Sequence, residues 1–280
     1  MCGLTGILVP RERTTDALHC LVQKMTAALV HRGPDADGIW AEDGIALGHR
    51  RLSILDLSPA GAQPMHSVCG RFVIVFNGEV YNHLDLRRDL MAAGAAPDWR
   101  GHSDTETLLA GIAHWGLDET LRRSAGMFAV ALWDRRERQL SLARDRIGEK
   151  PVYWGWAGRA LVFGSELKAL RQRGVLIVAS GNVVHNLQQA QRGAAANQAY
   201  DWALEFDQTI AGQVQQGQLD ALQNFQKLGS LATMTHPTYE HFLPLLYAAG
   251  AVAPCEQPEF FNTSFQLASI SMRSMVWGGR

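Results

Sequence analysis

The sequence lacks several features that would assign it to a particular class of protein. Its 280 residues carry 26 basic and 27 acidic side chains, a formal net charge of -1, and no long run of either sign. Such a balance gives no indication of the basic patch that would bind nucleic acid or a membrane surface. We therefore expect no nucleic-acid partner, and a small polar substrate.

Cysteines are few, and long apolar runs are missing. The four cysteines are too scattered for a disulfide framework or a CxxC metal knuckle, which favours a reducing cytoplasm. No run approaches the roughly 20 apolar residues of a membrane span. The start also lacks the basic and apolar segments of a secretion signal. These absences predict a cytoplasmic protein without a membrane partner, and they leave its oligomeric state open.

The apolar pattern indicates an α+β protein. An amphipathic stripe predicts a helix over residues 15–30. Ser103 stands three residues before Glu106, a capping-box spacing that predicts a helix beginning at Asp104. Short apolar runs predict buried strands at residues 72–76, 128–133, 140–143 and 160–163.

The residue composition changes after Lys168. Residues 175–179 are fully apolar and predict a strand, and the glutamine-rich stretch 187–228 predicts helix. No Pro/Gly/Ser-rich linker marks the change. We therefore expect two domains with an abrupt boundary near residues 169–174.

Cys2 is the first candidate catalytic residue. A methionine before a small residue is usually removed, which would leave Cys2 with both a thiol and a free α-amine. Their reference pKa values are roughly 8.5 and roughly 8, so one residue can supply nucleophile and base. Gly3 and Gly6 would let the backbone pass close to a substrate. A cysteine in second place by coincidence is the alternative.

A series of motifs accompanies Cys2 in the first part of the chain. They are Met1-Cys2-Gly3, His31-Arg32-Gly33-Pro34-Asp35, Gly48-His49-Arg50-Arg51-Leu52-Ser53-Ile54, Gly61-Ala62-Gln63-Pro64-Met65, Phe76-Asn77-Gly78-Glu79-Val80-Tyr81-Asn82, Ser103-Asp104-Thr105-Glu106, Gly126-Met127-Phe128-Ala129, Ala143-Arg144-Asp145-Arg146 and Ser165-Glu166-Leu167-Lys168. Together they resemble the class II glutamine amidotransferases, specifically the glutaminase domain of glutamine-dependent asparagine synthetases. The resemblance implies that residues 1–170 form such a domain without its last elements, an Ntn-hydrolase-type αββα sandwich of two antiparallel sheets.

The same resemblance assigns roles in glutamine hydrolysis. The Asn77 side chain and the Gly78 backbone N-H would stabilise the oxyanion formed when Cys2 attacks the side-chain amide. Arg51 would bind the substrate α-carboxylate, while Asp104 and Glu79 would receive its α-ammonium. This reaction needs no cofactor.

Backbone groups near Leu52 and Ile54 would complete the pocket. Each assignment has a structural alternative. Asn-Gly after an apolar run also predicts a hairpin turn, which could itself present the oxyanion donors. Asp104 could merely complement a helix dipole, and Arg51 could belong to a solvated arginine pair.

The later part of the chain does not match a synthetase. The Ser-Gly-Gly-x-Asp-Ser loop that holds ATP phosphates in such domains is absent, since Ser180-Gly181-Asn182 is followed by Val183 and Val184. Asparagine synthesis by this chain alone is therefore not expected.

Residues 174–280 instead resemble the carboxy-terminal part of LigB-type extradiol (4,5-DOPA) dioxygenases. The resemblance lies in residues 175–187, 202–207, 236–247 and 271–274. It implies an incomplete α/β fragment in which His185 and His241 would bind Fe(II) or zinc, with His236 nearby. Two histidines are fewer than the three protein ligands of a stable site. The other candidates, His31 and His49, belong to amidotransferase motifs and are interpreted as structural.

Three hypotheses therefore follow from the sequence. The first is a glutaminase that works through a γ-glutamyl thioester at Cys2. The second is a metal-dependent ring-opening dioxygenase in the later half. The third is an inactive hybrid of two incomplete domains.

Overall fold

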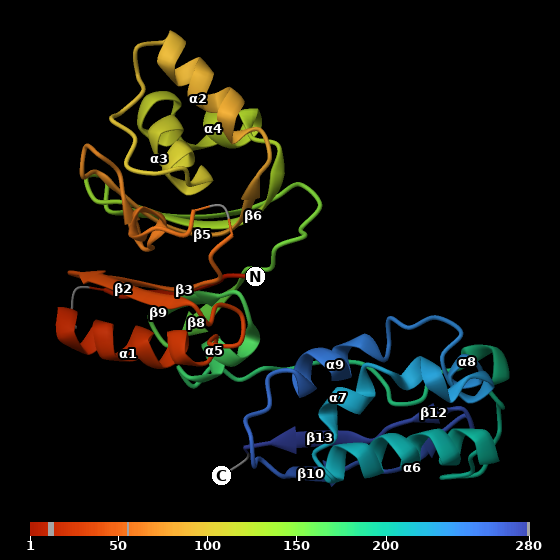
Figure 1. The fold of residues 1–280 in the computed structure, drawn as a ribbon. Coiled ribbons are helices and arrows are strands. Elements are labelled where there is room, and N and C mark those ends of the chain that lie inside the picture. The colour runs from red at the N-terminus through yellow and green to blue at the C-terminus, as the bar shows by residue number, and fades with distance from the viewer. Residues whose placement is uncertain (11–13, 55, 279–280) are drawn as a thin grey trace. The chain divides into compact units, whose positions relative to one another are not determined.

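The computed structural model describes residues 1–10, 14–54 and 56–278. The chain forms two compact units, Met1–Val175 and Leu176–Arg280, which are described separately (Figure 1). The predicted boundary at residues 169–174 lies just before this division. Within the described ranges, no helix combines the length and apolar character needed to cross a bilayer.

The first unit contains a five-stranded antiparallel sheet in the order β2-β3-β1-β9-β8. Its strands are Gly3–Leu8 (β1), Ala36–Glu42 (β2), Ile45–Arg51 (β3), Tyr153–Ala157 (β8) and Ala160–Gly164 (β9). The central strand β1 pairs with β3 from Gly3↔Arg50 to Leu8↔Ile45, and with β9 from Thr5↔Gly164 to Leu8↔Leu161. The strand that follows Cys2 is therefore held by β3 from Gly3 and by β9 from Thr5.

A second antiparallel sheet has the order β4-β5-β6-β7. Its strands are Met65–His66 (β4), Phe72–Val80 (β5), Gly126–Asp134 (β6) and Gln139–Arg144 (β7). Strand β5 pairs with β6 over its full length, whereas the short β4 reaches only Val73 and Ile74. The last residues of β5 therefore extend beyond the end of β4.

Helices cover the outer faces of the two sheets (Figure 1). Thr15–Ala27 (α1) and Leu167–Arg171 (α5) lie against the first sheet, and His83–Ala92 (α2), Asp104–Trp115 (α3) and Leu117–Arg123 (α4) lie over the second. The 3-10 turn η1 spans Pro59–Gly61. This arrangement is the αββα sandwich of the Ntn type, so the predicted α+β class and sandwich are confirmed.

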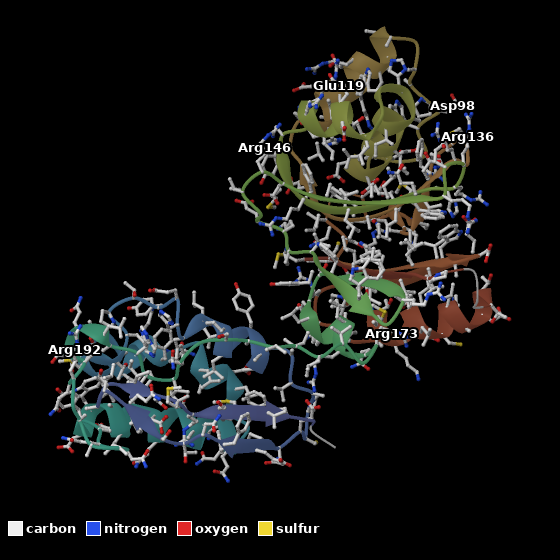
Figure 2. The ribbon with its side chains drawn as sticks, turned by 180° about the vertical axis from the view of Figure 1, so that it is seen from behind. Asp98, Glu119, Arg136, Arg146, Arg173 and Arg192 are labelled. Atoms are coloured by element: carbon white, nitrogen blue, oxygen red, sulfur yellow. The ribbon has the colours of Figure 1, made fainter. Side chains whose placement is uncertain are left out.

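One core of the first unit lies between the sheets, because alternate residues of facing strands are apolar. Figure 2 shows side chains filling this space, whereas the labelled Arg136 points outward. Trp133 is 1% exposed, and its indole N-H donates to Glu42 Oε1 at 2.6 Å. The buried members are Leu4, Ile45, Leu47, Val73, Val75, Ala129, Ala131, Trp133 and Phe163.

The predicted elements of this unit are largely confirmed. The four predicted strands are β5, β6, β7 and β9, and the helix expected over residues 15–30 is α1, which ends at Ala27. Helix α3 begins at Asp104, where Ser103 Oγ accepts from Thr105 N at 3.1 Å. The second contact of a capping box, from the backbone N-H of Ser103 to the Glu106 side chain, is not present among the described residues. Glu106 instead accepts the backbone N-H groups of Arg100 at 2.8 Å and Gly101 at 3.2 Å.

The second unit is a small helical assembly with short strands. Its helices are Asp201–Gln215 (α6), Leu219–Leu222 (α7), Ser230–Thr235 (α8) and Leu243–Ala249 (α9), with 3-10 turns Leu187–Gln189 (η2) and Phe225–Leu228 (η3). Strands Pro258–Phe261 (β10) and Ser274–Trp277 (β13) form one antiparallel pair, and Phe265–Gln266 (β11) and Ile270–Ser271 (β12) form another. These pairs do not confirm the predicted α/β fragment.

Two predicted elements of the later half are wrong. Residues 175–179 form no strand, and Leu176 and Val178 are 78% and 80% exposed, because no neighbouring strand pairs with this segment among the described residues. The stretch 187–228 is not one helix. Left-handed backbone at Gly193, Asn197 and Gly217 interrupts it, so helix is confined to short elements and α6.

Replacement of a core side chain tests the packing between the sheets. Phe163→Ala removes a ring that is 0% exposed, and we expect the unfolding free energy to fall by about 3–5 kcal/mol. Trp154→Ala is the control, because this partner of Phe163 on β8 is 60% exposed and should cost less than about 1 kcal/mol. Urea denaturation of the full chain, followed by near-ultraviolet circular dichroism, measures both. Equal losses would contradict the assigned core.

Candidate functional site

A cavity of about 120 Å³ in the first unit brings together every residue that the sequence predicted for the glutaminase site. It lies where β1 begins, β3 ends and β5 passes beyond β4. The predicted residues that line it are Cys2, Arg51, Leu52, Ile54, Asn77, Gly78, Glu79 and Asp104. Segments far apart in the sequence thus meet at one site.

The thiol of Cys2 lies against the backbone of the loop after β3. Leu52 N donates to Cys2 Sγ at 3.4 Å, and Sγ lies 3.5 Å from Leu52 O. Burial raises the pKa of the Cys2 thiol above its ordinary value. The neutral thiol is therefore favoured, and a nearby base is needed to generate the thiolate that acts as nucleophile.

An ion-pair network holds the backbone of Cys2. Arg32 Nε donates to Cys2 O at 2.9 Å, and Arg32 Nη1 binds Glu166 Oε1 at 3.0 Å. Glu166 also contacts His31 at 2.9 Å and Lys168 at 3.0 Å. Burial opposes ionisation of Glu166, but hydrogen bonds from these three partners lower its pKa. The His-Arg-Gly-Pro-Asp and Ser-Glu-Leu-Lys motifs therefore contact each other next to the backbone of Cys2.

The expected turn at Asn77-Gly78 is wrong, because both residues lie inside strand β5. Asn77 pairs with Ala129 and Gly78 with Phe128 in the ladder with β6. The apolar run continues to Val80, and pairing with β6 therefore outweighs the turn preference of Asn-Gly. A side chain at Gly78 would overlap the backbone of Met127 and Phe128, so only glycine fits this position.

Two hydrogen-bond donors of β5 face the cavity. The amide of Asn77 is 1% exposed, and its Nδ2 has no partner among the described residues. Phe76 N donates to Gln63 Oε1 at 2.6 Å and Val80 N to Asp104 Oδ2 at 2.9 Å. Because alternate N-H groups of a strand point the same way, the N-H of Gly78 points to this side too. A buried donor without an acceptor costs roughly 1–3 kcal/mol, so a bound oxygen would stabilise the site.

Arg51 forms the positive end of the cavity. Its Nη1 donates to Ser58 O at 2.9 Å, and its Nη2 donates to the backbone oxygen of Asp56. These bonds fix the guanidinium while leaving some of its five N-H donors for a ligand. A carboxylate is the group that this geometry suits best.

Asp104 and Glu79 form the negative end. Asp104 is 5% exposed, and burial raises the pKa of its carboxyl, although the hydrogen bond from Val80 N opposes this rise. Glu79 lines the same cavity from β5. A ligand ammonium would favour the ionised form of Asp104, so this end suits a cation. The roles of Asp104 as helix start and as cavity residue are compatible.

Gln63 and Lys150 also line the cavity, although the sequence assigned no role to either. Gln63 bridges Phe76 N and, at 3.3 Å, Thr105 Oγ1; it lies in a motif that the resemblance used. Lys150 is 7% exposed, and its Nζ donates to Met1 Sδ at 3.4 Å. The backbone N-H of Lys150 donates to Asp145, whose carboxylate organises that loop. No spacing in the sequence indicated Lys150.

A larger cavity of about 330 Å³ lies beside α3 in the same unit. It is lined by the turn between β4 and β5 and by Arg100, Glu106 and His114. It does not include Cys2 or the oxyanion donors. The smaller cavity is therefore the one that fits the predicted chemistry.

The predicted metal ligands His185 and His241 lie together in the second unit, with ring centroids 3.7 Å apart. His236 is buried, and its Nε2 donates to Val183 O at 2.8 Å, so this ring is used in packing. In the described part of the chain, no group of three His, Cys, Asp or Glu residues could hold a metal ion. A stable site needs at least three protein ligands, so the pair does not fit iron or zinc.

Comparisons with known proteins agree with the geometry of the first unit. A family model described as a glutamine amidotransferase domain matches residues 1–225, which include the whole cavity and part of the second unit. Asparagine synthetase (glutamine-hydrolyzing) 1 of Bacillus subtilis (strain 168) is 38% identical over 172 residues, which are 61% of this chain and 26% of that protein.

Other relatives give the same result. Asparagine synthetase B (glutamine-hydrolyzing) of Escherichia coli (strain K12) is 36% identical, over 61% of this chain and 30% of that protein. The chain therefore spans less than a third of the length of these two relatives. Glutamine phosphoribosylpyrophosphate amidotransferase from B. subtilis superposes with a TM-score of 0.52 at 21% identity, over 64% of this chain and 45% of that one. This likeness shows the fold. The extradiol resemblance of residues 174–280 stays a prediction.

His49 makes the stability of the site pH-dependent. The ring is 0% exposed and donates from Nε2 to Phe76 O at 3.0 Å, and burial lowers its pKa from 6.5 to about 4. Between these pH values the unfolded chain binds a proton that the folded chain does not, so the unfolding free energy falls as pH decreases. The contribution is at most about 3 kcal/mol.

The substitution His49→Gln should remove that part of the pH dependence. Glutamine keeps an N-H donor for Phe76 O but does not titrate. Urea denaturation at a series of pH values from 7 to 4 measures the difference between the two chains. A variant whose unfolding free energy follows the same pH curve as the original chain would contradict the role of His49.

Proposed function

The chain belongs to the glutamine amidotransferase domain family, and on that premise we propose that it hydrolyses glutamine to glutamate and ammonia through a thioester at Cys2. The observation that carries the proposal is the buried Nδ2 of Asn77, a donor without a partner among the described residues that lines the same cavity as the thiol. The names of the relatives, which include glutamine-hydrolyzing enzymes, support the same reaction.

The reaction begins at Cys2 after removal of Met1. The freed α-amine takes the thiol proton, and the thiolate attacks the side-chain amide carbon of glutamine, so that a C-S bond forms and the carbonyl oxygen becomes an oxyanion. The intermediate collapses with cleavage of the C-N bond, and the α-ammonium returns its proton to the leaving ammonia. Water then attacks the thioester, which releases glutamate and regenerates the thiol.

The oxyanion is the group that the cavity is built to receive. Asn77 Nδ2 and the N-H of Gly78 would donate to it, and both are fixed before substrate binds, because β5 is held by β6. A donor fixed in advance stabilises the transition state without a cost of reorganisation. The Asn-Gly pair thus acts from a strand rather than from a turn.

Charge complementarity selects glutamine. Its α-carboxylate would bind Arg51, and its α-ammonium would bind Asp104 and Glu79, all of which line the cavity. Backbone groups of Leu52 and Ile54 would contact the rest of the substrate. The proposed hydrolysis uses only groups of this chain, and it includes neither asparagine synthesis nor the histidine pair of the second unit.

The substitution Cys2→Ala should abolish ammonia release from glutamine, because it removes the nucleophile. It should also prevent covalent labelling by a glutamine-mimicking diazo ketone, read by mass spectrometry. Cys20→Ala is the matched control, since Cys20 is exposed on α1, and it should retain activity and labelling. An original chain with a free Cys2 amine that neither hydrolyses glutamine nor becomes labelled would overturn the proposed function.

The substitution Asn77→Ala should lower kcat by about 100- to 1,000-fold, the usual loss for one oxyanion donor. The KM for glutamine should change little, because the ground-state amide needs the donor less than the transition state does. Asn224→Ala, at an exposed position of the second unit, is the control. Steady-state ammonia release measures both, and an unchanged kcat would show that Asn77 does not stabilise the oxyanion.

A further inference from the structure

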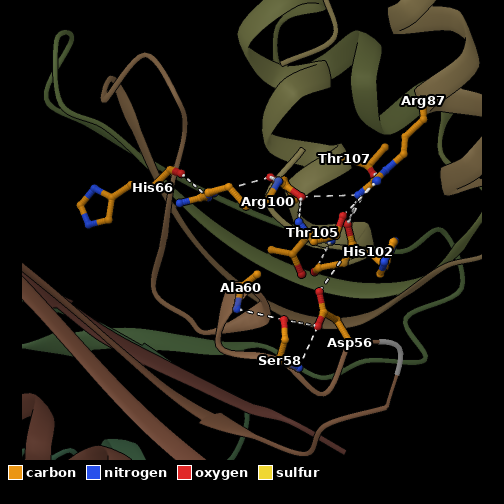
Figure 3. Close-up of polar contacts among 12 residues, drawn as sticks. Asp56, Ser58, Ala60, His66, Arg87, Arg100, His102, Thr105 and Thr107 are labelled. Carbon is orange, nitrogen blue, oxygen red and sulfur yellow. Dashed lines mark hydrogen bonds and ion pairs between the residues drawn. The ribbon is translucent and has the colours of Figure 1, made fainter. Parts of the chain in front are cut away.

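One residue, Asp56, contacts Arg51 through its backbone and the segment before Asp104 through its side chain. Asp56 is 8% exposed and lines the cavity. Its backbone oxygen accepts from Arg51 Nη2, at the positive end. Its side-chain Oδ2 accepts from His102 N at 2.9 Å, two residues before Asp104 at the negative end (Figure 3).

On the arginine side, Asp56 shapes the loop that holds the guanidinium. Its Oδ1 accepts from Ser58 N at 2.8 Å and from Ser58 Oγ at 2.6 Å. The backbone oxygen of Ser58 in turn accepts from Arg51 Nη1 at 2.9 Å. The hydrogen bond from the Ser58 hydroxyl lowers the pKa of Asp56 to about 2, so the carboxylate stays ionised at neutral pH.

On the helix side, Asp56 binds a segment that is fixed by other contacts. Arg87, from α2, donates to Gly101 O and Ser103 O, both at 3.1 Å. The Glu106 carboxylate accepts from Gly101 N at 3.2 Å. A Cβ atom at Gly101 would overlap Asp56 Oδ2, so the close approach of the two segments requires glycine there. The loop that contains Asp56 and Ser58 is thus joined to a segment that is held by several further hydrogen bonds (Figure 3).

We propose that Asp56 is a positioning residue that sets the separation between Arg51 and Asp104, and thereby makes the site specific for ligands that carry a carboxylate and an ammonium on the same carbon. The inference rests on the proposed function. Asp56 acts through Arg51 and the segment before α3, not by contact with the reacting atoms. A carboxylate that only stabilised the fold would impair all substrates equally.

The test compares three amides on the full chain and on Asp56→Asn. An amide side chain has one acceptor oxygen, so the variant can accept from the backbone N-H of Ser58 or from that of His102, but not from both. The substrates are glutamine, 4-aminobutanamide, which lacks the α-carboxylate, and glutaric acid monoamide, which lacks the α-ammonium. We expect kcat/KM for glutamine to fall about 10- to 100-fold, mainly through KM, and the values for the two analogues to change less than about threefold.

The substitution Ser58→Ala gives the same comparison if Asp56→Asn does not fold. It removes one donor to Oδ1 while the backbone N-H remains, and it should lower kcat/KM for glutamine about three- to tenfold with little effect on the analogues. Asp134→Asn is the matched control, because this carboxylate is also buried and accepts two backbone N-H groups, but it lies outside the cavity. It should leave the ratio of glutamine to analogue turnover unchanged.

Two results would overturn the inference. One is an equal loss for all three substrates in Asp56→Asn, and the other is no loss for glutamine. NMR titration of the same ligands into Cys2→Ala, with and without Asp56→Asn, repeats the comparison without turnover. A chain that binds glutamine with the expected dependence on Asp56 but releases no ammonia would contradict the proposed function and support the role of Asp56.

Discussion

The pairing of β1 on both sides is the constraint on which the site depends. β3 holds this strand from Gly3 onward and β9 holds it from Thr5 onward, so Cys2 directly precedes a strand with a fixed position. Arg32 adds a contact to the carbonyl of Cys2, and Leu52 N contacts its sulfur. A nucleophile at a free chain end would otherwise lose much of its reactivity to conformational freedom, because productive attack requires a defined geometry.

The same sandwich positions the other groups. Strand β5 extends past β4, which leaves its outer edge free to present donors, and α3 places Asp104 against the N-H of Val80. Arg51, at the end of β3, lines the same cavity as these residues of β5. The donors and Glu79 come from β5, Asp104 from α3 and Arg51 from β3. Their spacing depends on the loop contacts that join these elements, of which Asp56 makes several.

The αββα fold and eight of the residues that line the cavity were predicted from the sequence, because the motifs of the first unit resemble those of a known family. The prediction was wrong where tertiary pairing outweighs a local preference. Asn77-Gly78 has the composition of a turn but lies in a ladder with β6, and Glu106 binds Arg100 and Gly101 rather than completing a capping box. Asp56 contacts His102, and Lys150 contacts Met1. These partners are distant in sequence, and no local sequence pattern indicates such contacts. In the second unit, the apolar segment at 175–179 resembled a strand but has no partner to pair with among the described residues.

The central claim is that Cys2 forms a thioester with the glutamyl group of its substrate. Mass spectrometry of the purified chain, quenched in acid during turnover of glutamine, tests this directly. We expect Met1 to be absent and a γ-glutamyl adduct to map to the peptide beginning with Cys2. A chain with a free Cys2 amine that turns over glutamine but never carries the adduct, or carries it on another residue, would contradict the account.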